Sequence, residues 1–156
     1  MDAHEGTLTE SLFWDVLERG GVIGGSSAGA TIQGSFLASG DTGNNQIVVG
    51  DHEVGFGFIS SVAIDQHHIS QNRHFDIFAI LDRFPHLLGI GIDEGTAIEV
   101  SGYEFHVLGA GYVAIYDGAF WSREGSRLKQ LPETNRPFYY LRHRDRYDLA
   151  ERKVIR

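Results

Sequence analysis

The segment that most constrains the fold is the run of small residues at positions 24–30, GGSSAGA. It follows the short apolar run GVIGG and precedes AGATIQGSFLAS, whose spacing predicts a helix. The run fits G-x-S-x-G, a pattern in which the central serine occupies a sharp turn from strand to helix. We expect Ser27 to lie exposed at this turn. A glycine-rich turn or a phosphate cradle at the helix N-terminus would show the same residues, so the pattern alone leaves these uses open.

Composition limits the classes of function. The chain has 156 residues, enough for one domain, with no cysteine and a formal net charge of -8. This charge argues against a nucleic-acid partner, and the absence of cysteine excludes disulfides and thiolate chemistry. We find no apolar run long enough to span a membrane, and the opening MDAHEGTLTE does not resemble a signal peptide. We therefore expect a cytoplasmic protein without a membrane partner.

The apolar periodicity predicts an α/β sandwich with an added antiparallel portion. We expect helices over residues 9–19 and 74–84, with TLTE as the capping box of the first. Strands are expected at GVIGG, ISSVAID, LLGIGI and TAIEV, a short strand or hairpin at NQIVVGDHEVGFGF, and hairpin strands in YEFHVLGAGYVAIYDGAF. No repeat or linker divides the chain, so residues 1–156 form a single unit in this interpretation.

Polar side chains begin where three predicted strands end. Ser27 follows VIGG, His67 follows VAIDQ, and Glu94 follows GIGID. Because ligands bind at the carboxyl edge of open α/β sheets, parallel strands would bring these three side chains into one crevice. His67 could then take the proton of Ser27 while Glu94 orients the imidazole. Taken singly, a histidine beside a strand is more often structural, and Asp-Glu-Gly is also an ordinary turn.

The segment DQHHISQNRH raises a metal alternative through Asp65, His67, His68 and His74. Zinc sites need three or four converging ligands, and adjacent histidines in an extended chain point in different directions. The segment also lacks the H-E-x-x-H pattern. We therefore expect no metal and no other cofactor.

Taken together, GGVIGGSSAGA, DQHH followed by Arg73, GIGIDEGTAIEV and the closing DRYDLAERKV resemble the cyanophycinase-like branch of peptidase family S51, the dipeptidase E family. The resemblance extends from about Thr7 to the C-terminus. It implies a class I glutamine-amidotransferase-like, flavodoxin-like fold and a serine peptidase whose triad follows the order Ser27, His67, Glu94.

The same resemblance implies roles for other residues. The backbone N–H of Ala28 would be one oxyanion donor. Asp65, Gln66 and Arg73 stand where the family has polar residues that contact the substrate. The implied substrates are small acidic or isoaspartyl peptides, with Arg73 pairing to a substrate carboxylate.

Three departures from the family pattern are visible. Ser26 replaces the usual threonine, and His68 replaces the phenylalanine of DQHF. The third is that family members have further N-terminal βα units with a GGDQ-type loop. We therefore expect this chain to be the C-terminal, triad-bearing portion of such a peptidase, acting with a complementing N-terminal segment or as a homodimer.

Two other classes of function stay open at the level of sequence. An α/β-hydrolase-type esterase shares G-x-S-x-G but has the order Ser, acid, His, so His106 or His143 would be its base. A non-catalytic remnant domain would keep the turn and helix only as an anion site.

Overall fold

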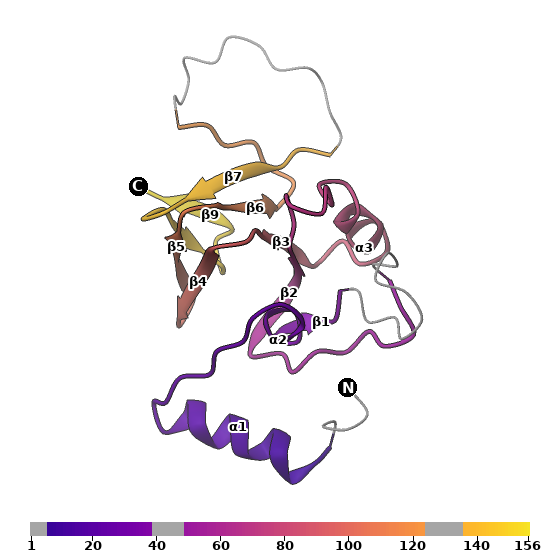
Figure 1. The fold of residues 1–156 in the computed structure, drawn as a ribbon, viewed down its shortest axis with the longest axis vertical. Helices are drawn as coiled ribbons and strands as arrows, with labels where there is room; N and C mark the ends of the chain where they lie inside the picture. Colours follow the sequence, from indigo (N-terminus) through magenta and orange to yellow (C-terminus); the bar gives the residue numbers. More distant parts are fainter. Residues whose placement is uncertain (1–5, 39–48, 124–135) are drawn as a thin grey trace.

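The computed structural model describes residues 6–38, 49–123 and 136–156. It contains a five-stranded sheet in the order β1-β2-β3-β6-β7 and a four-stranded sheet in the order β4-β5-β8-β9 (Figure 1). The strands of the first sheet are β1 (Gly34–Phe36), β2 (Ile59–Gln66), β3 (Leu88–Ile92), β6 (Tyr112–Tyr116) and β7 (Tyr139–Arg142). Those of the second are β4 (Thr96–Ser101), β5 (Glu104–Gly109), β8 (Arg146–Asp148) and β9 (Lys153–Ile155).

The first sheet is mixed. Strands β1, β2 and β3 are parallel, whereas β6 and β7 are antiparallel to their neighbours. The second sheet is antiparallel throughout. The predicted α/β class with an added antiparallel portion is therefore confirmed.

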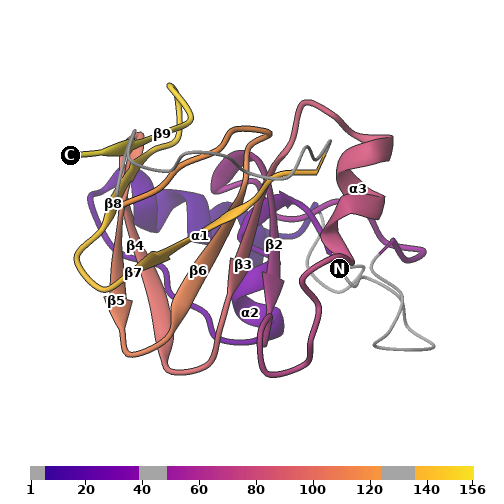
Figure 2. The ribbon, with the colours of Figure 1, turned by 90° about the horizontal axis from the view of Figure 1, so that it is seen from above.

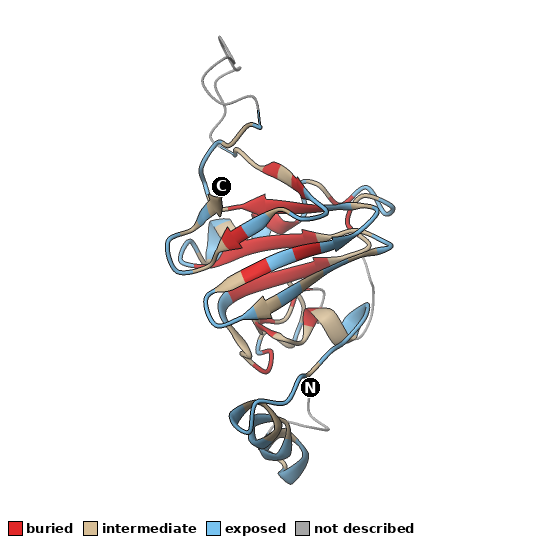
Figure 3. Cartoon of the chain, turned by 90° about the vertical axis from the view of Figure 1, so that its left-hand side faces the viewer, coloured by how far each residue is buried: buried red, intermediate tan, exposed pale blue. Residues whose placement is uncertain are grey.

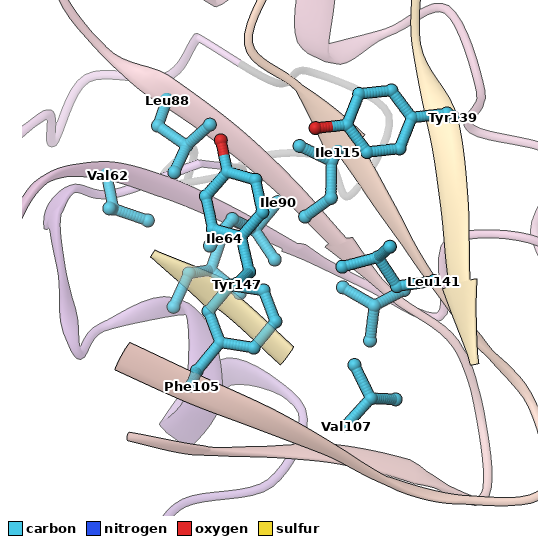
Figure 4. Close-up of a cluster of buried hydrophobic side chains, with 11 residues drawn as sticks. Val62, Ile64, Leu88, Ile90, Phe105, Val107, Ile115, Tyr139, Leu141 and Tyr147 are labelled. Carbon is cyan, nitrogen blue, oxygen red and sulfur yellow. The ribbon is translucent and has the colours of Figure 1, made fainter. Parts of the chain in front are cut away.

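Each face of the first sheet buries a separate apolar cluster. One face packs against the second sheet through residues that include Ile64, Ile90 and Phe105 (Figure 4). The other face packs against helix α3 (Ile77–Arg83), and Figure 2 shows α3 and the second sheet on opposite sides of the first sheet. Burial on both faces fits the nearly continuous apolar sequences of β2 and β3, and Figure 3 shows long buried stretches along the strands.

Helix α1 (Leu8–Glu18) lies apart from the sheets and buries none of its residues (Figure 1). Its contacts are aromatic: the ring centroids of Phe13 and Phe56 are 5.7 Å apart, and those of Trp14 and Phe58 are 5.0 Å apart. Thr7 caps it by accepting a hydrogen bond from the Glu10 N–H, as the capping box predicts. The helix begins and ends one residue before the predicted bounds.

Two predictions between α1 and β2 are wrong. The run GVIGG forms no strand, because a strand needs a second strand paired with it and none of the strands in the described part of the chain pairs with residues 21–26. The predicted helix after Ser27 is a single turn, α2 (Ala28–Thr31), before Gly34 begins β1. A Cβ at Gly34 would lie 2.7 Å from the Val62 carbonyl oxygen, so this glycine lets β1 approach β2 closely.

The predicted hairpins also differ in pairing. Strands β5 and β6 are consecutive but belong to different sheets, and the hairpin is formed by β4 and β5 instead. Of the segment NQIVVGDHEVGFGF, residues 45–48 lie outside the described residues. The remainder contributes one isolated antiparallel bridge, between Phe36 and Val54.

Candidate active site

The carboxyl ends of two parallel strands define the candidate site. Gln66 and Ile92 are register partners at the ends of β2 and β3. His67 follows Gln66 directly, and Glu94 is the second residue after Ile92. Helix α2 lies against β2 (Figure 1). Ser27, the residue before the helix, contacts His67 and so lies at the same edge of the sheet.

Ser27 occupies a strained turn, with φ 53° and ψ −126°. Backbone conformations of this kind cost about 1–3 kcal/mol for a non-glycine residue and concentrate at functional sites. Gly25 makes the turn possible, because a Cβ there would lie 2.1 Å from the Gly29 carbonyl oxygen. The structure thus explains why the residues around Ser27 are small.

The three predicted catalytic side chains lie in hydrogen-bonding contact. Ser27 Oγ is 3.0 Å from His67 Nε2, and His67 Nδ1 is 3.1 Å from Glu94 Oε1. In the tautomer that satisfies both contacts, Nδ1–H donates to the carboxylate and Nε2 accepts from the hydroxyl. Ser27, His67 and Glu94 therefore have the geometry of a serine, a histidine base and an orienting carboxylate.

The other two histidines considered as bases lie elsewhere. His106 is on β5, and its Nε2 is 3.0 Å from Glu104 Oε1. His143 is exposed at the turn between β7 and β8. The contact between Ser27 and His67 therefore favours the order Ser, His, Glu over that of an α/β-hydrolase.

Ala28 follows Ser27 in the chain, and the side chain of Gln66 approaches the Ser27 hydroxyl. Ala28 is the first residue of α2, where a backbone N–H has no intrahelical acceptor and remains available to an oxyanion. Because α2 has only four residues, its dipole adds little to this site. The side-chain oxygen of Gln66 is 3.3 Å from Ser27 Oγ and can accept a hydrogen bond from it.

Asp65 and Arg73, also predicted to contact the substrate, are buried instead. Their side chains are 1% and 8% exposed, and Arg73 Nη1 donates to Asp65 Oδ1 at 3.2 Å. The second oxygen of Asp65 is 2.8 Å from Nδ1 of the fully buried His68. This burial argues against direct contact with a substrate. It indicates that Asp65 and Arg73 support the loop of residues 67–73, which carries His67 and is called the His67 loop below.

Two residues that support this loop were not singled out from the sequence. Asp93 Oδ1 accepts the backbone N–H groups of Ile69 and Ser70, each at 3.1 Å. Ser70 Oγ lies 3.1 Å from the His67 carbonyl oxygen and 3.5 Å from Glu94 Oε1. The acidic pair Asp93-Glu94 was the available signal, because the first carboxylate holds the loop and the second contacts His67.

The candidate site is open to solvent. The side chains of His67 and Glu94 are 32% and 65% exposed, and Ser27 is exposed as well. Charge interactions in such a setting are weaker than in an enclosed site, because water screens them. Any strong stabilisation of an oxyanion would require the site to be covered further.

The histidine-rich segment does not form a metal centre in the described part of the chain. No group of three or more His, Cys, Asp or Glu side chains there is arranged to hold an ion. Asp65 and His68, two of the residues considered as ligands, bind each other.

Among the helices of the described residues, none is long and apolar enough to cross a membrane.

Comparison with known proteins decides the family. The sequence profile described as "Peptidase family S51" matches residues 2–108, more than half of the chain. The chain belongs to peptidase family S51. Membership confirms the resemblance to family S51 that the motifs indicated.

Curated relatives in this family are named cyanophycinase. The protein of Geminocystis herdmanii is 36% identical over 135 residues, covering 81% of this chain and 49% of the relative. The protein of Trichormus variabilis is 32% identical over 165 residues, covering 96% of this chain and 54% of the relative. The protein of Synechococcus elongatus is 36% identical over 118 residues, covering 72% of this chain and 36% of the relative. The chain thus spans about half the length or less of these S51 relatives.

Proposed function

We propose that this S51 chain carries the catalytic triad of a serine peptidase that hydrolyses aspartyl or isoaspartyl peptide bonds. The observation that supports the proposal is the continuous contact from Ser27 through His67 to Glu94, at 3.0 and 3.1 Å. The substrate class is part of the proposal, because it is what the family resemblance implies.

In the proposed reaction, Ser27 Oγ attacks the scissile carbonyl carbon while His67 Nε2 takes the hydroxyl proton. The negative charge that forms on the carbonyl oxygen is stabilised by the N–H of Ala28. Glu94 stabilises the imidazolium, which then protonates the leaving amine. A water molecule, deprotonated by His67, hydrolyses the acyl-enzyme and releases Ser27.

Around this triad, Gln66 is the side chain we assign to substrate contact, because its amide lies at the nucleophile. Its oxygen approaches Ser27 Oγ in the free site, and its NH₂ group can donate to a substrate carboxylate. Asp65 and Arg73 are assigned to holding the His67 loop.

We also propose that full activity requires a complementing N-terminal segment or a partner chain, a homodimer being one such arrangement. The open triad supports this, as do the exposed apolar side chains before it, with Leu8 74% and Val22 90% exposed. A second oxyanion donor supplied in this way would be worth a factor of about 10²–10³ in rate.

We also propose a cytoplasmic location, with which the absence of cysteine in the sequence is compatible.

The test compares α-aspartyl, isoaspartyl and lysyl dipeptides as substrates, with amine release measured by chromatography. The assay uses the chain alone and the chain mixed with the N-terminal half of a cyanophycinase relative. We expect release from the aspartyl substrates only, and a loss on the order of 10⁴- to 10⁶-fold in Ser27→Ala. Ser26→Ala, the neighbouring serine, is the matched control. Equal hydrolysis by parent and Ser27→Ala would refute the proposal.

A further inference from the structure

Directly beneath the His67 loop lies a buried polar network centred on His68. The His68 side chain is 1% exposed. Its Nδ1 is 2.8 Å from Asp65 Oδ2, and its Nε2 is 2.7 Å from the hydroxyl oxygen of Tyr116 on β6. The network therefore connects the end of β2 to β6, the strand on the other side of β3.

The partners of His68 fix where its protons lie. The Tyr116 hydroxyl donates its one proton to the His74 carbonyl oxygen at 2.8 Å, so it can only accept from His68 Nε2–H. Asp65 is paired with the Arg73 guanidinium, which favours the ionised carboxylate as the acceptor of Nδ1–H. Both contacts are satisfied together when each ring nitrogen of His68 donates a hydrogen bond.

The sheet leaves a specific space for this ring. Gly91 on β3 is the register partner of Asp65, and a Cβ there would lie 2.5 Å from His68 Cγ and 2.6 Å from Nδ1. Any other residue at position 91 would displace the imidazole. The backbone of β3 and the two polar partners, Asp65 and Tyr116, together hold the ring in one orientation.

His67 needs such support, because its backbone has φ 54°, a left-handed conformation that non-glycine residues rarely adopt. The loop closes through hydrogen bonds from Gln71 N–H to the His67 carbonyl and from Arg73 N–H to the His68 carbonyl, both at 2.9 Å. Since Arg73 also binds Asp65, the loop is held at both ends by the network around His68.

We propose that His68, protonated on both ring nitrogens, is the positioning residue for His67, an inference that rests on the proposed function. Anchored to Asp65 and Tyr116, it keeps the left-handed turn at His67 and so keeps Nδ1–H on Glu94 and Nε2 toward Ser27. It acts through His67 and does not touch the reacting atoms.

The test is long-range ¹H–¹⁵N NMR of the histidine rings in the full ¹⁵N-labelled chain at neutral pH. We expect both His68 nitrogens to be protonated and His67 to occupy the single tautomer with its proton on Nδ1. In His68→Phe, which keeps an aromatic ring but removes both hydrogen bonds, we expect His67 to show a mixture of tautomers.

Tyr116→Phe is the milder variant, and it decides the question if His68→Phe does not fold. It removes one partner of His68 while keeping the ring that stacks on Phe138 with centroids 5.0 Å apart. Tyr147→Phe is the matched control, since it removes a buried hydroxyl that donates to Asp117 at 2.9 Å in the other apolar cluster. The His67 signals should change in Tyr116→Phe and stay unchanged in Tyr147→Phe.

A neutral His68 with one ring proton, or an unchanged His67 tautomer in the folded variants, would overturn the inference. A second measurement follows the rate at which a fluorophosphonate modifies Ser27. A positioning role predicts about tenfold slower modification with the same final fraction labelled, whereas local unfolding alone would lower the fraction. If the parent, mixed with the N-terminal half of a cyanophycinase relative, resists labelling while the NMR pattern holds, the peptidase proposal fails and the positioning of His67 by His68 stands.

Discussion

The fit between Gly91 and His68 leads to a prediction whose size can be worked out from the structure. In Gly91→Ala the new methyl group would lie 2.5–2.7 Å from three atoms of the buried imidazole, Cγ, Nδ1 and Cδ2. Optimal contacts between such atoms are about 3.5–4.0 Å, so the ring must retreat by roughly 1 Å. A shift of that size distorts the bonds to Asp65 and Tyr116, now 2.8 and 2.7 Å long.

The expected cost of Gly91→Ala is about 1–3 kcal/mol of unfolding free energy from overpacking. In a domain of this size, each kcal/mol lowers the melting temperature by about 2–4 °C. Urea unfolding followed by tryptophan fluorescence measures the loss, because Trp121 packs against the core between the sheets. Gly24→Ala is the matched control, since a Cβ at Gly24 meets no atom within 4 Å.

A double-mutant cycle then identifies the cause of the loss. In a His68→Ala background the clash is absent, so Gly91→Ala should cost almost nothing there, and the two substitutions should couple by about 1–3 kcal/mol. An equal cost of Gly91→Ala in both backgrounds would show that the glycine is required for another reason, and the reasoning about the ring would be refuted.

Three further predictions concern the loop and the charged groups. Asp93→Ala should lower the unfolding free energy by about 1 kcal/mol and slow fluorophosphonate labelling of Ser27, because two backbone N–H groups lose their acceptor. An unchanged urea midpoint and labelling rate would contradict this. Burial opposes the ionisation of Asp145, but hydrogen bonds from Arg123 and the Arg142 N–H lower its pKa overall. The resulting stability is present above the ordinary carboxyl pKa and is lost as pH falls through the folded value, so Arg123→Gln should destabilise more at about pH 7 than at about pH 3. Equal urea midpoint shifts at both pH values would count against the pairing. Burial, then the Asp117 carboxylate, raises the pKa of Tyr147 above its ordinary value of 10.0. The associated stability is complete below pH 10 and is lost at higher pH, so Tyr147→Phe should lose less stability than the parent between about pH 9 and pH 11 in the same assay.

The sequence predicted the position of the candidate site better than its surroundings. His67 and Glu94 follow apolar runs that are too continuous for a half-exposed strand, so their place at the carboxyl edge of a parallel sheet could be inferred. The small residues around Ser27 similarly predicted the turn. These are local patterns. The rule that ligands bind at the carboxyl ends of parallel strands then predicted that the three side chains lie close together.

Tertiary contacts decided the features that the sequence could not predict. Residues 21–26 have the apolar content of a strand, but a strand exists only where another backbone pairs with it. Strands β5 and β6 follow each other as a hairpin would, yet β5 pairs with β4 and β8 while β6 pairs with β3 and β7. Nothing in the local sequence separates these two arrangements.

The burial of Asp65 and Arg73 could not be predicted, because it depends on residues far along the chain that enclose the neighbouring His68. Tyr116 and Gly91 lie 48 and 23 residues from His68, and together they turn a histidine-rich segment into a buried network. From the sequence alone, the polar residues after β2 pointed to substrate or metal binding. Their burial beneath the loop is a property of the packed sheet.

Fluorophosphonate labelling of the chain, with the modified residue mapped by mass spectrometry, tests whether Ser27 is an activated nucleophile. The comparison includes the parent, Ser27→Ala, Ser26→Ala and His67→Ala, each with and without the N-terminal half of a relative. We expect labelling on Ser27 that survives Ser26→Ala, disappears in Ser27→Ala and His67→Ala, and increases with the added half. Labelling that persists in His67→Ala, or a folded and complemented chain that is not labelled, would contradict the claim that Ser27 is an activated nucleophile.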